Sequence, residues 1–216
     1  MKYNAIIWDL DGTLLDTLGD LAASVNAALT KNGCPTRSID EVRRFVGNGV
    51  ENLMRRAMPE GREDVEFDRL FADFRAHYAL HSNDTTSPYP GVIPALLQLK
   101  HQGIKMAVVS NKLDSAVKSL CLLHFGDLID VAIGEREGVR RKPAPDSVLQ
   151  AMELLGTTDA VYIGDSEVDI ATAKNAELPC ICVSWGFRSE ETLRHAGAEK
   201  IAPDAEALMK LLNEEE

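Results

Sequence analysis

Short apolar runs recur along the chain, and amphipathic stretches separate most of the later ones. The runs that predict strands lie at 5–8, 105–109, 131–134, 160–163 and 179–183. Helix-like spacing of apolar residues lies between the later runs, at about 92–102, 113–124, 145–155, 167–176 and 204–213. Strands that alternate with helices indicate a parallel sheet covered on both faces. We therefore expect an α/β fold with a doubly wound parallel sheet.

Residues 17–82 interrupt this alternation because their pattern is wholly helical. Apolar spacing predicts helices at 18–32, 39–45, 50–58 and 65–81, separated by glycine and proline residues. We expect a helical cap at 17–82, inserted into a core that comprises residues 1–16 and 83–216. The polar segment at 82–88 is the expected hinge. A bundle placed after the first strand could act as a lid that excludes water from a site there.

Charge and composition narrow the function classes. The 216 residues carry a net charge of -11, which opposes binding to nucleic acids and to anionic membranes. No apolar run approaches the roughly 20 residues that a membrane span needs. The start leads directly into a strand pattern, without a signal-peptide pattern, and the four cysteines lack zinc-site spacing. We expect a cytoplasmic protein that is a monomer or a weak homodimer.

Two carboxylates, Asp9 and Asp11, directly follow the first apolar run, and Gly12 and Thr13 come next. Side chains alternate along a strand, so both carboxylates would share one side of the chain. Close like charges are costly unless a cation or a shared proton relieves them. This pattern suggests a metal-assisted site in which one carboxylate is a nucleophile and the other carries a proton. A turn with an aspartate cap, or a fragment of a calcium loop, is the plainer alternative.

A second acidic loop, with Asp165 and Asp169, follows the run at 160–163. Its plainer interpretation is a helix N-cap formed by Asp165 or Ser166. Ligands of open parallel sheets bind beyond the carboxyl ends of the strands, where the first acidic loop also lies. Oxygen ligands from both loops would suit Mg²⁺.

Two further motifs suggest an anion site. Ser110 and Asn111 end the run at 105–109, where a hydroxyl and backbone amides at a helix start could bind an anion. Lys142 lies in a basic triplet and could balance Asp9, a phosphate and the second acidic loop. A helix cap and a solvated basic loop are the respective alternatives. The chain lacks Gly-x-Ser-x-Gly and a glycine-rich phosphate loop, which disfavours a serine hydrolase and a nucleotide-driven switch.

In order, these motifs resemble the four motifs of the haloacid dehalogenase superfamily of aspartyl-phosphate enzymes. Residues 9–13 resemble the first motif, Ser110-Asn111 the second, Lys142-Pro143 the third and residues 164–169 the fourth. The resemblance covers almost the whole chain. Within the superfamily, the chain is similar to phosphoglycolate phosphatases at 46–50, 89–91, 110–112 and 142–145, and its helical insert resembles their cap.

The resemblance implies a role for each motif residue. Asp9 would attack phosphorus, and Asp11 would protonate the leaving alcohol and then deprotonate water. Asp169 would orient Lys142 or a metal-bound water. Asp9, the Asp11 carbonyl and Asp165 would bind Mg²⁺, and Ser110, Asn111 and Lys142 would bind the phosphate. Gly12 and Thr13 would support the first loop. The cap loop of Gly47, Asn48 and Gly49 would close over the substrate.

These implied roles lead to one expected function and several alternatives. We expect a Mg²⁺-dependent phosphatase of a small phosphorylated metabolite, with 2-phosphoglycolate as the leading candidate. Pyrophosphate, a nucleoside monophosphate or a sugar phosphate could be hydrolysed by the same mechanism, and a sugar phosphomutase is a related alternative. The alternative from another class is a non-catalytic phosphate-binding regulator, against which the presence of both Asp9 and Asp11 argues. Two residues depart from the usual pattern: Ser110 replaces a threonine, and Gly19 replaces a common proline.

Overall fold

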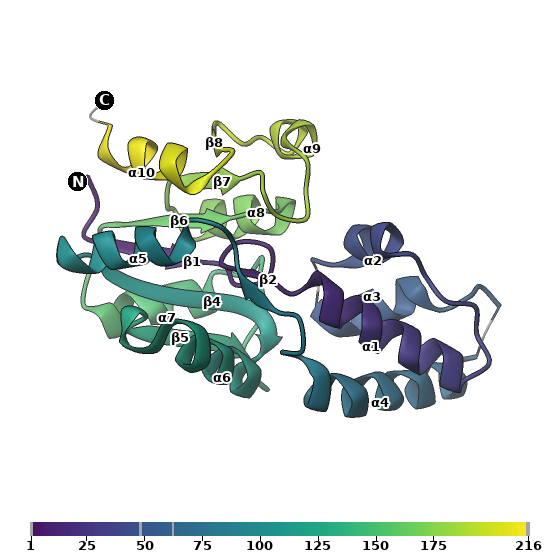
Figure 1. The fold of residues 1–216 in the computed structure, drawn as a ribbon. Coiled ribbons are helices and arrows are strands. Elements are labelled where there is room, and N and C mark those ends of the chain that lie inside the picture. The colour runs from purple at the N-terminus through teal and green to yellow at the C-terminus, as the bar shows by residue number, and fades with distance from the viewer. Residues whose placement is uncertain (1, 48, 62, 215–216) are drawn as a thin grey trace. The chain divides into compact units, whose positions relative to one another are not determined.

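The computed structural model describes residues 2–47, 49–61 and 63–214 and divides the chain into two compact units (Figure 1). The larger unit comprises Met1–Leu15 and Pro88–Glu216, and the smaller unit is Asp16–Ser87. The chain passes between the units through the short strands β2 (Leu15–Asp16) and β3 (Ser87–Pro88), which pair with each other. Within the described ranges, no helix has both the length and the apolar character to cross a membrane.

A six-stranded parallel sheet forms the centre of the larger unit. Its central strands are β1 (Ala5–Trp8), which is wholly buried, and β6 (Ala160–Gly164), which is also wholly buried. The full strand order is β5 (Val131–Glu135), β4 (Lys105–Leu113), β1, β6, β7 (Cys180–Val183) and β8 (Lys200–Ala202). The predicted α/β fold with a doubly wound parallel sheet is confirmed.

Helices cover both faces of this sheet, because successive strand residues point to opposite sides. Ile6 and Trp8 of β1 belong to one apolar cluster, and Ala5 and Ile7 belong to the other. The first cluster includes side chains of α5 (Val92–His101), α6 (Asp114–Phe125) and α10 (Ala205–Asn213), and the second includes α7 (Asp146–Leu155) and α8 (Glu167–Asn175). The remaining short helices are η1 (Gly126–Leu128) and α9 (Glu190–His195). Because both faces are covered, the ends of the strands remain the place for a site.

The smaller unit contains the four helices that the sequence predicts. They are α1 (Leu18–Lys31), α2 (Ile39–Phe45), α3 (Gly49–Ala57) and α4 (Asp64–His81). Helices α1 and α4 pack against each other and bury Leu21 and Val25 on one side and Leu70 and Phe74 on the other. Amphipathic helices of this length gain most of their stability from such packing.

A buried carboxylate joins the two ends of the smaller unit. Asp20, in the first turn of α1, is only 2% exposed. It accepts hydrogen bonds from the backbone N–H and the hydroxyl of both Thr85 and Thr86, at 2.6–3.1 Å. Burial alone would raise the pKa of Asp20, but these hydrogen bonds outweigh it and lower the pKa below its usual value.

Candidate active site

Asp9 lies at the carboxyl end of β1, one residue past the sheet. Its backbone N–H donates to the carbonyl of Ile163 on β6 at 2.8 Å, which continues the parallel pairing of the two strands by one residue. Strand β6 ends at Gly164, so Asp165 leaves the sheet beside Asp9. The two acidic loops are therefore neighbours, because the strands that precede them pair with each other.

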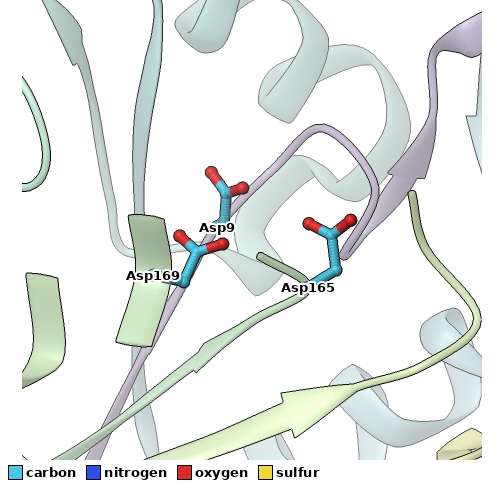
Figure 2. Close-up of side chains that lie close together, drawn as sticks. All are labelled: Asp9, Asp165 and Asp169. Carbon is cyan, nitrogen blue, oxygen red and sulfur yellow. The ribbon is translucent and has the colours of Figure 1, made fainter. Parts of the chain in front are cut away.

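Three buried carboxylates meet at this edge of the sheet. Figure 2 shows Asp9, Asp165 and Asp169 close together, and one oxygen of each lies within 4.8 Å of the others. Burial, with the charge of Asp169, raises the pKa of Asp9 to about 7, although Lys142 acts in the opposite direction. Burial and the charges of Asp169 and Asp9 also raise the pKa of Asp165 well above its usual value. The cluster therefore resists carrying three negative charges without a cation.

Lys142 supplies one positive charge to the cluster and is itself only 5% exposed. Its Nζ donates to Asp9 Oδ1 at 2.7 Å, to Asp169 Oδ1 at 2.9 Å and to the hydroxyl of Tyr162 at 2.9 Å. Burial would lower the pKa of Lys142, but the charges of Asp169 and Asp9 outweigh it and raise the pKa well above its usual value. An ammonium group has three donors, so this one is fully engaged in the described structure.

Two polar side chains position Lys142 from opposite ends. Asn111 accepts a hydrogen bond from the backbone N–H of Lys142 at 2.9 Å and donates to its carbonyl at 3.0 Å. Asp169 binds the ammonium and Tyr162 through Oδ1, and Ser166 through Oδ2. Both side chains therefore act on Lys142 in this structure, and both polar groups of the Asn111 amide bind its backbone.

The first loop and Asp165 are built against each other. Asp165 accepts hydrogen bonds from the hydroxyl of Thr13 at 3.3 Å and from the backbone N–H of Phe187 at 2.7 Å. Gly12 has φ of +88°, and a Cβ at this position would collide with the Asp165 carboxylate. Only glycine combines this backbone angle with such a close approach.

Asp11 and Ser110 both lie beside a second buried lysine. Lys112 Nζ donates to Asp11 Oδ1 at 2.9 Å, and the backbone N–H of Lys112 donates to Ser110 Oγ at 3.2 Å. The β4–β5 register shifts between Val109 and Leu113. Such an irregularity lets consecutive residues turn toward one site.

The cap glycines lie in the smaller unit. Gly47 has φ of +133° and Gly49 has φ of +80°. Asn48, the middle residue of the expected cap loop, lies outside the described residues. Their expected role at the substrate stays a prediction.

Sequence reasoning missed three parts of this site. Tyr162 lies within an apolar run that predicts a strand, although its hydroxyl contacts Lys142 and Asp169. The sequence prediction contains Lys112 only as part of the motif at 110–112, and it assigns no role to the loop 184–188. In that loop the Trp185 indole N–H donates to the carbonyl of Thr13 at 3.0 Å. The loop directly follows the carboxyl end of β7, so the rule that placed the acidic loops would have found it.

Comparisons with known proteins agree on one family. The sequence model of the haloacid dehalogenase-like hydrolases matches residues 6–183. A phosphoglycolate phosphatase of Rhodobacter capsulatus is 36% identical over 198 residues, which cover 89% of this chain and 90% of the relative. A plasmid phosphoglycolate phosphatase of Cupriavidus necator is 33% identical over an alignment that covers 98% of this chain and 94% of the relative. A crystal structure from Lactobacillus delbrueckii subsp. bulgaricus has a TM-score of 0.94 and 37% identity, and all of both chains is covered.

Proposed function

The chain belongs to the haloacid dehalogenase-like hydrolase family, and on that premise we propose that it hydrolyses 2-phosphoglycolate to glycolate and phosphate through an aspartyl-phosphate. The family and the relatives identify the chain as a phosphoric monoester hydrolase. One observation carries the finer proposal: Asp9 lies in a buried acidic cluster with its carboxylate 2.7 Å from the ammonium of Lys142. The names of the relatives support the choice of substrate.

In the first step, Asp9 is the nucleophile. Lys142 engages Asp9 Oδ1, while Oδ2 accepts no hydrogen bond from the residues that the structure describes. Attack by Asp9 on phosphorus forms the new O–P bond as the bond from phosphorus to the glycolate oxygen breaks. Asp11 donates its proton to that departing oxygen, so glycolate leaves as the alcohol.

In the second step, Asp11 works in the reverse direction. It takes a proton from a water molecule, which attacks the phosphorus of the aspartyl-phosphate. The O–P bond to Asp9 breaks, and phosphate and the free carboxylate are regenerated. Ser110 and Lys142 bind the phosphoryl oxygens in this proposal. Asn111 and Asp169 hold Lys142 in place, because their side chains already bind it.

The chemistry of the acidic cluster fits a divalent cation, and we propose Mg²⁺. Three buried carboxylates face one buried ammonium, which leaves an excess of negative charge before the phosphate arrives. Hard oxygen ligands of this kind suit Mg²⁺. Asp9 and Asp165 would hold it with their side chains and Asp11 with its carbonyl. When bound, the cation would offset the repulsion between these carboxylates and the phosphate.

The test is phosphate release from a panel of phosphomonoesters and pyrophosphate, with Mg²⁺ or with a chelator. We expect 2-phosphoglycolate to have the highest kcat/KM and Asp9→Asn to lower kcat by about 10⁴-fold or more. Asp127→Asn changes an exposed carboxylate of the same unit and should leave kcat unchanged. An acid-labile phosphoprotein should accumulate in wild type after rapid mixing.

Different failures of this test contradict different parts of the proposal. If another ester has a higher kcat/KM than 2-phosphoglycolate, the proposed substrate is wrong, but the proposed mechanism stands. Full activity of a correctly folded Asp9→Asn variant would overturn the mechanism. Equal activity with Mg²⁺ and with the chelator would contradict the proposed requirement for a divalent cation.

A further inference from the structure

The ammonium of Lys112 has no role in the reaction described above, yet it contacts the proposed proton carrier Asp11. Its side chain is only 4% exposed, and its Nζ is 2.9 Å from Asp11 Oδ1. Burying an ammonium group is costly, and an ion pair offsets that cost only in part. A surface lysine on a nearby helix would not carry this cost, so the position of Lys112 requires an explanation.

The charges of the site show what a second ammonium could do. Lys142 has all three of its donors engaged by Asp9, Asp169 and Tyr162. Arg188 is paired with Glu167 through two nitrogens, at 2.9 and 3.2 Å. Lys112 is a further buried cation beside these groups, and its Nζ donates to the proposed proton carrier Asp11.

The chemistry of the substrate places its second anionic group beside that same carrier. Asp11 must contact the ester oxygen to protonate it. In 2-phosphoglycolate the carboxylate carbon is joined to that oxygen through a single CH₂ group. A cation in hydrogen-bond contact with Asp11 is therefore within reach of the substrate carboxylate.

We propose that Lys112 binds the carboxylate of the substrate. It thereby selects phosphomonoesters whose carboxylate is one CH₂ group away from the ester oxygen over simple alkyl phosphates; this inference rests on the proposed function. The ammonium pairs with Asp11 in the free protein and with the substrate carboxylate in the complex. Charge-assisted hydrogen bonds of this kind are short and strong, which gives the site a means of discrimination.

The first test compares 2-phosphoglycolate with ethyl phosphate, in which a methyl group replaces the carboxylate. We expect Lys112→Met to lower the ratio of the two kcat/KM values by about tenfold or more, and Lys112→Arg to lower it less. Lys118→Met removes an exposed lysine of α6 and should leave the ratio unchanged. An equal loss for both esters would overturn the proposal, because Lys112 would then act through Asp11 alone. Hydrolysis of ethyl phosphate that depends on Asp9, without any preference for 2-phosphoglycolate, would overturn it and leave the phosphatase mechanism intact.

The second test needs neither turnover nor a folded Lys112→Met single variant. Asp11→Asn removes the carboxylate charge that Lys112 contacts, so calorimetry should give an affinity for glycolate about threefold to tenfold higher than in wild type. The double variant Asp11→Asn/Lys112→Gln should lose this gain. An unchanged glycolate affinity in a folded Asp11→Asn variant would overturn the proposal, even if the chain hydrolyses other esters.

Discussion

Tyr162 is the residue whose chemistry most changes the picture of the site. Its hydroxyl lies 2.9 Å from Lys142 Nζ and 3.0 Å from Asp169 Oδ1, and its side chain is fully buried. Without this oxygen, one of the three ammonium donors would lose its partner. A buried donor without a partner costs about 1–3 kcal/mol. Tyr162 therefore supports the position and the charge of Lys142.

Replacing Tyr162 with phenylalanine should weaken phosphate binding more than it changes the fold. We expect Tyr162→Phe to lower kcat/KM by about tenfold, with a large part of the loss in KM, because Lys142 would no longer be held on three sides. Steady-state kinetics with the best substrate of the panel would measure this. Tyr3→Phe changes another buried tyrosine of the same unit and serves as the control. Equal kinetics of the two variants would contradict the role given to Tyr162.

The raised pKa of Asp9 predicts how pH affects metal binding. At a pKa of about 7, Asp9 is mostly protonated in more acidic solutions, and a metal ligand must lose its proton. The apparent Mg²⁺ association constant should therefore rise as the pH increases toward 7, by about tenfold per pH unit for each ligand that must lose a proton. Calorimetric Mg²⁺ titrations over about two pH units on either side of 7 would measure this.

A variant without the Asp9 carboxyl proton provides the control for this pH dependence. Asp9→Asn should bind Mg²⁺ more weakly, with a shallower dependence on pH. A slope in the variant as steep as in wild type would show that another group carries the proton, and would contradict the assignment to Asp9.

The chemical role of a single residue could be predicted only where the residue stands out from the apolar pattern around it. Asp9 and Asp165 are polar residues that end apolar runs, so the strand-end rule indicated them. Tyr162 lies within such a run, where an aromatic residue is usually part of the core. Its hydroxyl acts on Lys142, which is 20 residues away in the chain, and no local pattern carries that information.

Among the elements, the first loop depends most on one backbone position. Gly12 has φ of +88°, and any side chain there would meet Asp165. Gly103 has a similar φ of +75°, but apart from its own chain neighbours no described residue has an atom within 4 Å of a Cβ placed on it. Both positions carry the free-energy cost of a left-handed backbone angle, but only Gly12 adds a collision. Comparing variants at the two positions therefore separates these two costs.

Alanine at the two positions should have different effects. Gly103→Ala should lower the free energy of unfolding by about 1 kcal/mol, the cost of a left-handed angle for a residue with a Cβ, and leave kinetics unchanged. Gly12→Ala should have the same backbone cost and should also displace Asp165. Because metal ligands and the groups that support them need a defined geometry, we expect the Mg²⁺ affinity to fall by about tenfold or more. Urea unfolding and Mg²⁺ titration would measure both effects. Equal Mg²⁺ affinities in the two variants would contradict the collision.

The clarity of an element's apolar pattern largely determines how well its position could be predicted. The strands β1, β5 and β6 and all four helices of the smaller unit lie within one residue of the predicted bounds at most ends, because each has a clear apolar pattern. Strand β4 extends to Leu113, past the predicted end at 109. Its last part is polar because it serves the site. The sequence does not predict the three-residue strand β8 or the six-residue helix α9, because segments this short show no apolar periodicity.

For the whole molecule, the decisive feature is that the chain crosses twice between two units. The sequence indicated an insertion because a wholly helical stretch interrupts the strand–helix alternation. It did not indicate the pairing of β2 with β3, since two-residue strands have no apolar pattern. It also gave Asp20 no role, because its partners Thr85 and Thr86 are about 65 residues away.

Asp20 should therefore matter for the stability of the smaller unit as a whole. Its carboxylate accepts hydrogen bonds from two backbone N–H groups and two hydroxyls, and together these groups join the start of α1 to the returning segment. Asp20→Asn keeps the size of the side chain but removes the charge and one acceptor. It should lower the free energy of unfolding by about 2–4 kcal/mol. Asp40→Asn, an exposed carboxylate on α2, should stay within about 0.5 kcal/mol of wild type.

The pH dependence and the location of this loss make the prediction specific. Because the folded pKa of Asp20 is lowered, its contribution is fully present above its unfolded pKa near 4 and is lost as the pH falls through the folded value. The gap between wild type and Asp20→Asn should therefore narrow in acid. In hydrogen exchange near neutral pH, the variant should lose protection in α1 and α4 and keep it in β1 and β6. Equal loss in the central strands would contradict a local role, since the defect would then have destabilised both units together.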